Sequence, residues 1–277
     1  MKKYTMNLMI LLFTSIPVKA QLQVMSYNIK YANENDGENS WSNRKDDLAA
    51  QIRFYEPHIF GVQEALQGQL EFLENELDNQ YKYFGKGRDD GAQKGEFSAI
   101  FFKTDDLELL KEGTFWLSST PETPGKGWDA AYPRVCTYGK FRLKNSGKEF
   151  WVFNTHFDHV GKEARRQSVR LIHNKISELN QKKLPVVLMG DLNLEPDTEE
   201  VNYLASHYKD SKKVADHTFG PEGTFNAYKF NQPVTTRIDY IFTDGEVQVK
   251  KYAVLSDSRD LRYFSDHLPV IVDLKLK

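Results

Sequence analysis

The segment PVVLMGDLN, residues 185–193, decides the fold class of this 277-residue chain. Its first half is an uninterrupted run of β-branched and other apolar residues, which is typical of a buried strand. Its second half turns polar at Asp191 and Asn193, directly after Gly190, so the strand should end there. The segment therefore indicates a sheet protein with polar, chemically useful side chains at the end of a central strand.

Seven further segments are rich enough in β-branched and aromatic residues to be strands. They cover residues 22–29, 58–63, 98–102, 134–143, 149–155, 238–242 and 269–274. Helical periodicity fits residues 44–55, 66–77 and 162–180, and more weakly 198–206. No repeat or low-complexity linker separates these segments, so the chain predicts one α/β domain over residues 21–277.

The tripeptide NSG at residues 145–147 lies between two of these strands and is a hairpin signal. A hairpin joins antiparallel strands, whereas an α/β alternation is typical of parallel ones. We therefore expect mixed sheets.

Residues 1–20 have the pattern of a secretory signal peptide. Lys2 and Lys3 precede an apolar run, and small residues end the segment at Ala20. The apolar run is shorter than the roughly 20 residues of a membrane-spanning helix. We expect cleavage after Ala20 and export to the periplasm or the medium, and an uncleaved N-terminal anchor is the alternative.

The charge balance argues against a protein that holds long duplex DNA. The chain has 37 basic and 39 acidic residues, and cleavage after Ala20 removes three lysines and no acid, which leaves a net charge of −5. Duplex binders usually carry a basic excess, because phosphate contacts dominate their affinity. Cys136 is the only cysteine, so no disulfide can form within the chain and stability must come from a core.

Six strands are followed, interrupted or preceded by polar residues that could carry chemistry. The motifs contain Asn28, Gln63-Glu64, Asn154-Thr155-His156, Gly190-Asp191-Leu192-Asn193, Ile238-Asp239-Tyr240 and Ser265-Asp266-His267. Taken singly, an Asp or Asn after a strand is usually a turn former or a helix cap. Asp239 is harder to explain in that way, because a carboxylate inside an apolar strand needs a partner to offset its desolvation.

In this combination and order, the six motifs resemble the endonuclease/exonuclease/phosphatase superfamily, the group that contains DNase I and exonuclease III. The resemblance spans nearly all of residues 21–277. It implies a four-layer α/β/β/α sandwich, in which two mixed sheets pack face to face and helices cover them. It also implies hydrolysis of phosphate esters with a divalent metal ion.

The resemblance implies a metal site around Glu64, with Asn28 and Asp266 assisting directly or through water. Oxygen ligands of this kind suit Mg²⁺ or Mn²⁺. Zinc is the weaker alternative, because the sequence has no close helical pair of histidines and no cysteine–histidine cluster.

The resemblance also assigns the groups that move protons. His267, paired with Asp239, is expected to activate the water, and Asp191 with Asn193 to hold the nucleophile and a phosphate oxygen. Family members have also been interpreted with the counterpart of Asp191 as the base, so the choice between Asp191 and His267 stays open.

His156 matches the histidine that donates a proton to the leaving oxygen, and Glu96 matches the acid that orients it. Arg134 matches an arginine that contacts the substrate phosphate. The abasic-site endonuclease branch lacks a histidine at the position of His156. This difference argues against an abasic-repair function, as does the expected export.

The longest stretch without periodicity, residues 113–133, leads directly into Arg134 and predicts a functional loop. The flat apolar faces of Trp128 and Tyr132 are expected to contact substrate, and a local core that pins the loop is the alternative.

We expect a phosphodiesterase or nuclease first. A phosphomonoesterase, or a phosphoesterase acting on phospholipid or inositol phosphate, is the alternative on the same site. A silent binding protein or a structural secreted protein would not need this set of carboxylates and histidines. No obligate protein partner is implied.

Overall fold

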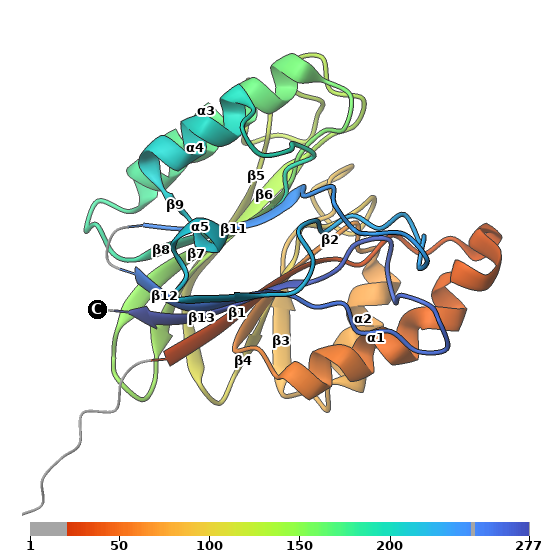
Figure 1. Ribbon diagram of the computed structural model, residues 1–277. Helices are drawn as coiled ribbons and strands as arrows, with labels where there is room; N and C mark the ends of the chain where they lie inside the picture. The colour runs from red at the N-terminus through yellow and green to blue at the C-terminus, as the bar shows by residue number, and fades with distance from the viewer. Residues whose placement is uncertain (1–20, 245–246, 277) are drawn as a thin grey trace, which may run out of the picture.

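The computed structural model describes residues 21–244 and 247–276. Two β-sheets pack against each other, and helices cover the outer side of each sheet (Figure 1). This is the α/β/β/α sandwich that the sequence resemblance implies. The predicted signal peptide, residues 1–20, lies outside the described residues.

The first sheet has β1 and β13 near its centre. Its strands, in spatial order, are β10 (His217–Phe219), β12 (Val247–Val254), β13 (Val270–Leu276), β1 (Gln21–Asn28), β2 (Ile59–Gln63), β4 (Ile100–Lys103) and β3 (Tyr81–Phe84). β1 runs parallel to β2 and antiparallel to β13. The sheet is therefore mixed, as expected.

The second sheet has β7 and β8 at its centre. Its strands, in spatial order, are β5 (Leu107–Trp116), β6 (Val135–Leu143), β7 (Glu149–His156), β8 (Val186–Asp191), β11 (Asp239–Thr243) and β9 (Lys209–Asp210). β6 and β7 pair antiparallel across the hairpin that the NSG tripeptide predicts, while β7 and β8 are parallel.

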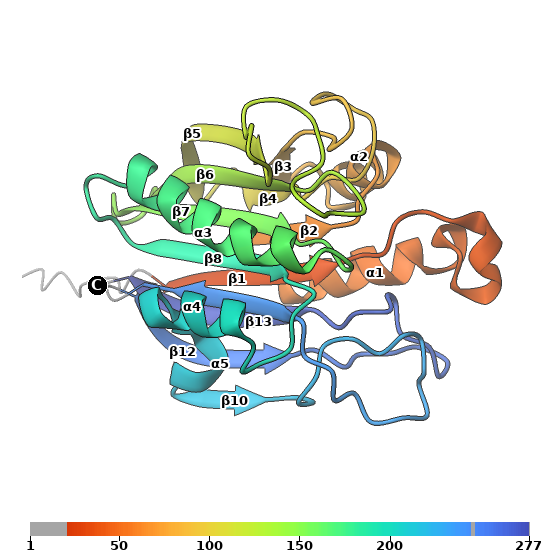
Figure 2. The ribbon, with the colours of Figure 1, turned by 90° about the horizontal axis from the view of Figure 1, so that it is seen from above.

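Helices cover the two outer faces. They are α1 (Trp41–Tyr55), α2 (Gln67–Glu76), α3 (Lys162–Leu179) and α4 (Glu199–His207). The short α5 (Ser211–Val214) packs against β11 and β12, one strand of each sheet, and the 3₁₀ helix η1 (Glu34–Asn39) packs against α1. α1 and α2 bury Leu48 and Leu70 against the first sheet. α3 and α4 bury Ile172 and Leu204 against the second, and Figure 2 shows α3 running along β7 and β8. In the part of the chain that the structure describes, no helix is long and apolar enough to cross a membrane.

The core between the sheets is a continuous apolar layer. Val24 and Ile59 from the first sheet meet Phe141, Val187 and Ile241 from the second, and all five are fully or almost fully buried. Burying a side chain of this size is worth roughly 1.5–3 kcal/mol. This shared layer fixes the two sheets against each other, and so it fixes the distance between the strand ends that form the site.

The structure corrects the start of the predicted loop. Residues 113–116 belong to β5, where Gly113 pairs with Tyr138 and Trp116 with Val135. β5 is an edge strand, and its mixture of charged and apolar residues hides the strand alternation. The irregular segment therefore begins at residue 117.

Candidate active site

Strand register aligns three predicted residues in one row across the second sheet. His156 ends β7 and lies opposite Asp191, the last residue of β8. Asp239, the first residue of β11, lies opposite Asp191 on the other side. Because the side chains of directly paired residues share one face of a sheet, the three project together.

The first sheet contributes the facing half of the site. Asn28 ends β1, and Glu64 directly follows β2, which is parallel to β1. The turn before β13 returns to the same end, where the Ser265 hydroxyl donates to the carbonyl of Asn28 at 2.7 Å. That bond places Asp266 and His267 beside the end of β1.

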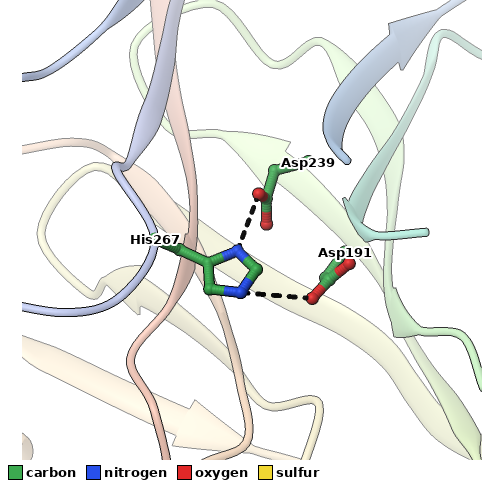
Figure 3. A group of neighbouring side chains, drawn as sticks. All are labelled: Asp191, Asp239 and His267. Atoms are coloured by element: carbon green, nitrogen blue, oxygen red, sulfur yellow. Dashed lines mark hydrogen bonds and ion pairs between the residues drawn. The ribbon is translucent and has the colours of Figure 1, made fainter. Parts of the chain in front are cut away.

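Asp191, Asp239 and His267 form a buried triad that joins the two sheets (Figure 3). Nδ1 of His267 lies 2.9 Å from Oδ2 of Asp239, and Nε2 lies 3.8 Å from Oδ2 of Asp191. Burial alone would lower the pKa of His267, but the Asp239 carboxylate outweighs it and raises the pKa to about 10. In this arrangement the imidazole is a cation held between two carboxylates.

Asp191 has the environment of a general base. Asn28 Nδ2 donates to its Oδ2 at 2.9 Å, and the backbone N–H of Asn193 donates to its Oδ1 at 2.9 Å. Burial, and then the neighbouring charge of Asp239, raises the pKa of Asp191 to about 7, which is well matched to proton transfer near neutral pH.

Glu64 and Asp266 converge on a place where positive charge is stabilised. The Lys30 ammonium lies 3.8 Å from Oε2 of Glu64 and 3.5 Å from Oδ2 of Asp266. Burial would raise the pKa of Glu64, but Lys30, His267 and the hydrogen bond from Asn28 hold it below its ordinary value. Two carboxylates that both contact an ammonium group have the charge and the oxygen atoms that suit a hard divalent ion.

Asn28 connects this carboxylate pair with the triad. Its Nδ2 donates to Glu64 at 3.0 Å as well as to Asp191, and its Oδ1 accepts from the backbone N–H of Lys30 at 3.0 Å. In this arrangement Asn28 orients the carboxylates rather than offering a free ligand atom.

The triad is a second group whose composition suits a cation. One ligand atom from each of Asp191, Asp239 and His267 lies within 4.8 Å of the others. Oδ1 of Asp239 is also buried without a hydrogen-bond partner in the described part of the chain. The ring of His267, however, already pairs with Asp239, so Glu64 and Asp266 are the better candidates to hold a metal ion.

His156 has a different neighbour from the one expected. Its Nδ1 lies 3.0 Å from the Arg134 guanidinium but 3.9 Å from Glu96, beyond hydrogen-bonding distance. Glu96 pairs instead with Arg88 at 2.6 Å. Glu96 thus lies near His156, as predicted, but makes no hydrogen bond to it, because the guanidinium groups of Arg88 and Arg134 surround the acid.

The charge state of His156 follows from the same neighbours. Burial, together with Arg134 and Arg88, lowers its pKa well below the ordinary value, so the ring is neutral. Nδ1 must then accept from Arg134, because a guanidinium has only donors. The proton then lies on Nε2, which is 3.5 Å from Oδ2 of Asp191. The amide nitrogen of Asn193, itself a donor, lies 3.1 Å from Nε2 and donates to the carbonyl of Phe157 at 3.0 Å.

A cavity of about 500 Å³ opens over these groups. Its wall includes the predicted Tyr132 and Arg134, together with Glu64, Glu96, His156, Asp191, Asn193, Asp266 and His267. Tyr132 is 49% exposed and stacks on His159 with ring centroids 6.0 Å apart. Trp128, 40% exposed, is not part of the wall, so the structure does not bring it to the cavity.

Sequence reasoning missed six residues of this wall. They are Lys30, Tyr31, Arg88, His159, Phe225 and Ile238. His159 and Ile238 lie inside or beside motifs already recognised, and Lys30 is two residues beyond Asn28, so proximity in sequence could have suggested them. Arg88 comes from a glycine-rich loop that carries no strand-end signal.

Comparisons with known proteins identify the family. The Endonuclease/Exonuclease/phosphatase family profile matches residues 25–267. A family member of known structure from Bacteroides thetaiotaomicron is 39% identical, with a TM-score of 0.90, over 94% of this chain and 99% of that one.

Two further relatives cover most of the chain. A mannosyl-6-phosphatase from Bacteroides thetaiotaomicron is 41% identical, with a TM-score of 0.88, over 91% of this chain and 99% of that one. The uncharacterised protein L388 of Acanthamoeba polyphaga mimivirus is 28% identical over 84% of this chain and 91% of its own length. The chain belongs to the endonuclease/exonuclease/phosphatase family of metal-dependent phosphoester hydrolases.

Proposed function

We propose that the protein is a phosphomonoesterase that removes a terminal phosphate from a small polar molecule, with a sugar phosphate as the leading substrate class. The observation that carries this proposal is the concentration of three cationic side chains, Lys30, Arg88 and Arg134, in the wall of one cavity.

The number of cations matters because it distinguishes the two kinds of phosphate ester. A terminal phosphate carries a charge of about −1.5 to −2 at pH 7, whereas a phosphodiester carries one negative charge. Guanidinium groups also bind phosphate oxygens in a planar, bidentate fashion. Two arginines and a lysine beside the two metal-binding carboxylates match a terminal phosphate better than a diester.

The size of the cavity and the similarity to a mannosyl-6-phosphatase support the same substrate class. A cavity of about 500 Å³ is within the range of small-molecule sites. Its wall combines polar groups with the flat faces of Tyr132 and Phe225, which suit the apolar side of a sugar ring.

We assign the proton transfers to residues of the second sheet and the final turn. Asp191 takes a proton from the attacking water. The water oxygen bonds to phosphorus, and the bond between phosphorus and the leaving oxygen breaks. His267, kept cationic by Asp239, stabilises the negative charge that develops beside Asp191. Of the two candidate bases, we therefore propose Asp191.

His156 then acts as a neutral hydrogen-bond donor through Nε2 to a phosphate or leaving oxygen. Its lowered pKa disfavours the proton-donor role that the resemblance assigns to it. The leaving alkoxide takes its proton from water, and the hydroxide formed takes the proton that Asp191 holds, which restores the carboxylate.

A divalent ion, Mg²⁺ or Mn²⁺, would be held by Glu64 and Asp266, with Asn28 orienting them, and would supply Lewis-acid polarisation of the phosphate. Mg²⁺ and Mn²⁺ are preferred over zinc because both ligands are carboxylate oxygens, which suit hard ions. Both carboxylates already contact a positive charge, the Lys30 ammonium.

A pair of generic substrates tests the proposal. We expect the wild-type protein with Mn²⁺ to hydrolyse p-nitrophenyl phosphate with a higher kcat/KM than bis-p-nitrophenyl phosphate. Arg88→Ala should lower the monoester value at least 10-fold and the diester value much less. Arg166→Ala, which removes an exposed arginine of α3, is the matched control and should change neither. Equal loss on both substrates would contradict the assignment.

A phosphodiesterase or nuclease, expected first from the sequence, is the second candidate. The half-exposed ring of Tyr132 favours it, because such a face can stack on a base. Higher kcat/KM for single-stranded oligonucleotides than for sugar phosphates would select it.

We also propose that the mature protein is exported after cleavage at Ala20. The charged start and apolar run of residues 1–20 support this. N-terminal sequencing of the protein recovered from the periplasm or medium tests it, and a mature protein that still begins at Met1 would contradict it.

A further inference from the structure

Asp158 lies behind the active site and has no part in the chemistry assigned above. It follows β7 by two residues and is 2% exposed. It does not line the cavity, yet it touches both the end of β7 and the loop of residues 117–134 that carries Tyr132 and ends at Arg134.

The carboxylate of Asp158 accepts five hydrogen bonds. Oδ1 accepts from the backbone N–H groups of Ala131 (3.1 Å), Val160 (3.0 Å) and Gly161 (2.8 Å). Oδ2 accepts from the backbone N–H of Tyr132 (3.2 Å) and from Nε of Arg134 (3.4 Å). Burial opposes ionisation, but these donors outweigh it and hold the pKa of Asp158 far below its ordinary value.

Arg134 links Asp158 to two histidines. While Nε faces Asp158, the two terminal nitrogens of Arg134 lie 3.0 Å from Nδ1 of His156 and 3.2 Å from Nδ1 of His159. Asp158 therefore fixes the plane of the guanidinium, and the guanidinium requires both Nδ1 atoms to be acceptors. A continuous contact runs from Asp158 through Arg134 to the ring of His156.

We propose that Asp158 is a positioning residue that sets the tautomer of His156 through Arg134 and holds Tyr132 at the cavity wall. The inference rests on the proposed function only for its kinetic readout. The tautomer of His156 is a property of the folded protein and can be measured without any substrate.

A nearby aspartate provides a matched control. Asp129, in the same loop, accepts from the backbone N–H groups of Glu163 (3.2 Å) and Ala164 (2.7 Å) at the start of α3. It anchors the loop as Asp158 does, but no contact joins it to Arg134. A purely structural role would give Asp158→Asn and Asp129→Asn similar consequences.

The decisive experiment reads the His156 ring by ¹⁵N NMR of protein labelled at histidine nitrogens. In the wild type we expect a neutral ring with the proton on Nε2. Asp158→Asn should shift population towards the Nδ1–H tautomer or the protonated ring, and Asp129→Asn should not. Arg134→Gln must change the same signals, which keeps the proposal testable if Asp158→Asn does not fold. An unchanged His156 spectrum in folded Asp158→Asn would overturn it.

The kinetic readout is a double-mutant cycle on p-nitrophenyl phosphate. Asp158→Asn and Arg134→Gln should each lower kcat/KM about 10- to 100-fold, and the double variant should be little worse than the worse single variant, because one acts through the other. If the fold-losses in kcat/KM of the two single variants multiply in the double variant, Asp158 and Arg134 act independently and the proposed coupling is wrong. No turnover by the wild type would contradict the proposed function and leave the NMR result to decide on Asp158.

Discussion

His267 is the residue whose charge depends most clearly on a single neighbour. Its ring is almost fully buried, which by itself favours the neutral form, and the Asp239 carboxylate 2.9 Å away reverses that preference. The folded-state pKa of about 10 lies above the ordinary value of 6.5. This difference stabilises the fold fully below pH 6.5, and the contribution is lost as the pH rises through 10.

Asp239→Asn should remove most of this contribution. In chelator, the free energy of unfolding of the wild type should fall between pH 7 and pH 10 by on the order of a few kcal/mol. The variant should be less stable at pH 7. Its free energy of unfolding should change much less between pH 7 and pH 10, because burial then keeps its His267 neutral. Urea denaturation at the two pH values measures this. Parallel curves for the two proteins would show that His267 is not held as a cation.

Glu64 carries the metal assignment at the residue scale. Glu64→Gln keeps the shape and removes the charge, so we expect the affinity for Mn²⁺ to fall about 10- to 100-fold or more, and kcat to fall with it. Isothermal titration calorimetry measures the first effect. Glu178→Gln, an exposed acid of α3, is the control and should bind Mn²⁺ like the wild type. Unchanged affinity in Glu64→Gln would place the ion elsewhere, with the Asp191, Asp239 and His267 triad as the next site.

Among the structural elements, the central strands could be predicted and the edge strands could not. β1, β7, β8 and β11 are buried apolar runs, and each ends or begins at a polar motif that the sequence displays. β3, β9 and β10 are short edge strands, and β12 is broken by a bulge after Val249, so their alternation is weak. Motifs on central strands therefore revealed the site's chemistry before its geometry was known.

In the loop of residues 117–134, the sequence alone could not predict which side chains reach the cavity. Its aromatic residues indicated function, but the sequence did not separate Tyr132 from Trp128. The separation depends on tertiary contacts: Asp158 accepts from the backbone of Tyr132, and the ring lies over Arg88 at 5.0 Å. His156 has Arg134 and not the predicted Glu96 as its hydrogen-bond partner, because Glu96 pairs with Arg88. No local sequence pattern places Arg88 near the site.

Tyr132 and Trp128 consequently give opposite predictions. Tyr132→Ala should raise KM for a sugar phosphate about 5- to 10-fold, since it removes a cavity wall worth roughly 1 kcal/mol or more, with little change in kcat. Trp128→Ala should leave KM unchanged, because its ring lies outside the cavity. Steady-state kinetics of both variants, with thermal unfolding as a check on the fold, measures this. A higher KM in Trp128→Ala alone would restore the original assignment.

At the scale of the whole molecule, the sandwich brings together two half-sites that neither sheet holds alone. The first sheet supplies the carboxylates for the ion, and the second supplies Asp191 and Asp239, with His267 reaching between them (Figure 3). The apolar layer between the sheets sets their spacing. The expected net charge of −5 after cleavage makes the three basic side chains of the cavity wall a local feature, which suits a small anion rather than a long polyanion.

The most direct test of this account is the release of inorganic phosphate from a hexose 6-phosphate by the purified mature protein. We predict release with Mg²⁺ or Mn²⁺, loss of release in excess chelator with recovery on adding back the ion, and a fall in kcat by a factor on the order of 10² to 10⁴ in Asp191→Asn. Phosphate release at an undiminished rate in chelator, or by Asp191→Asn, would contradict it.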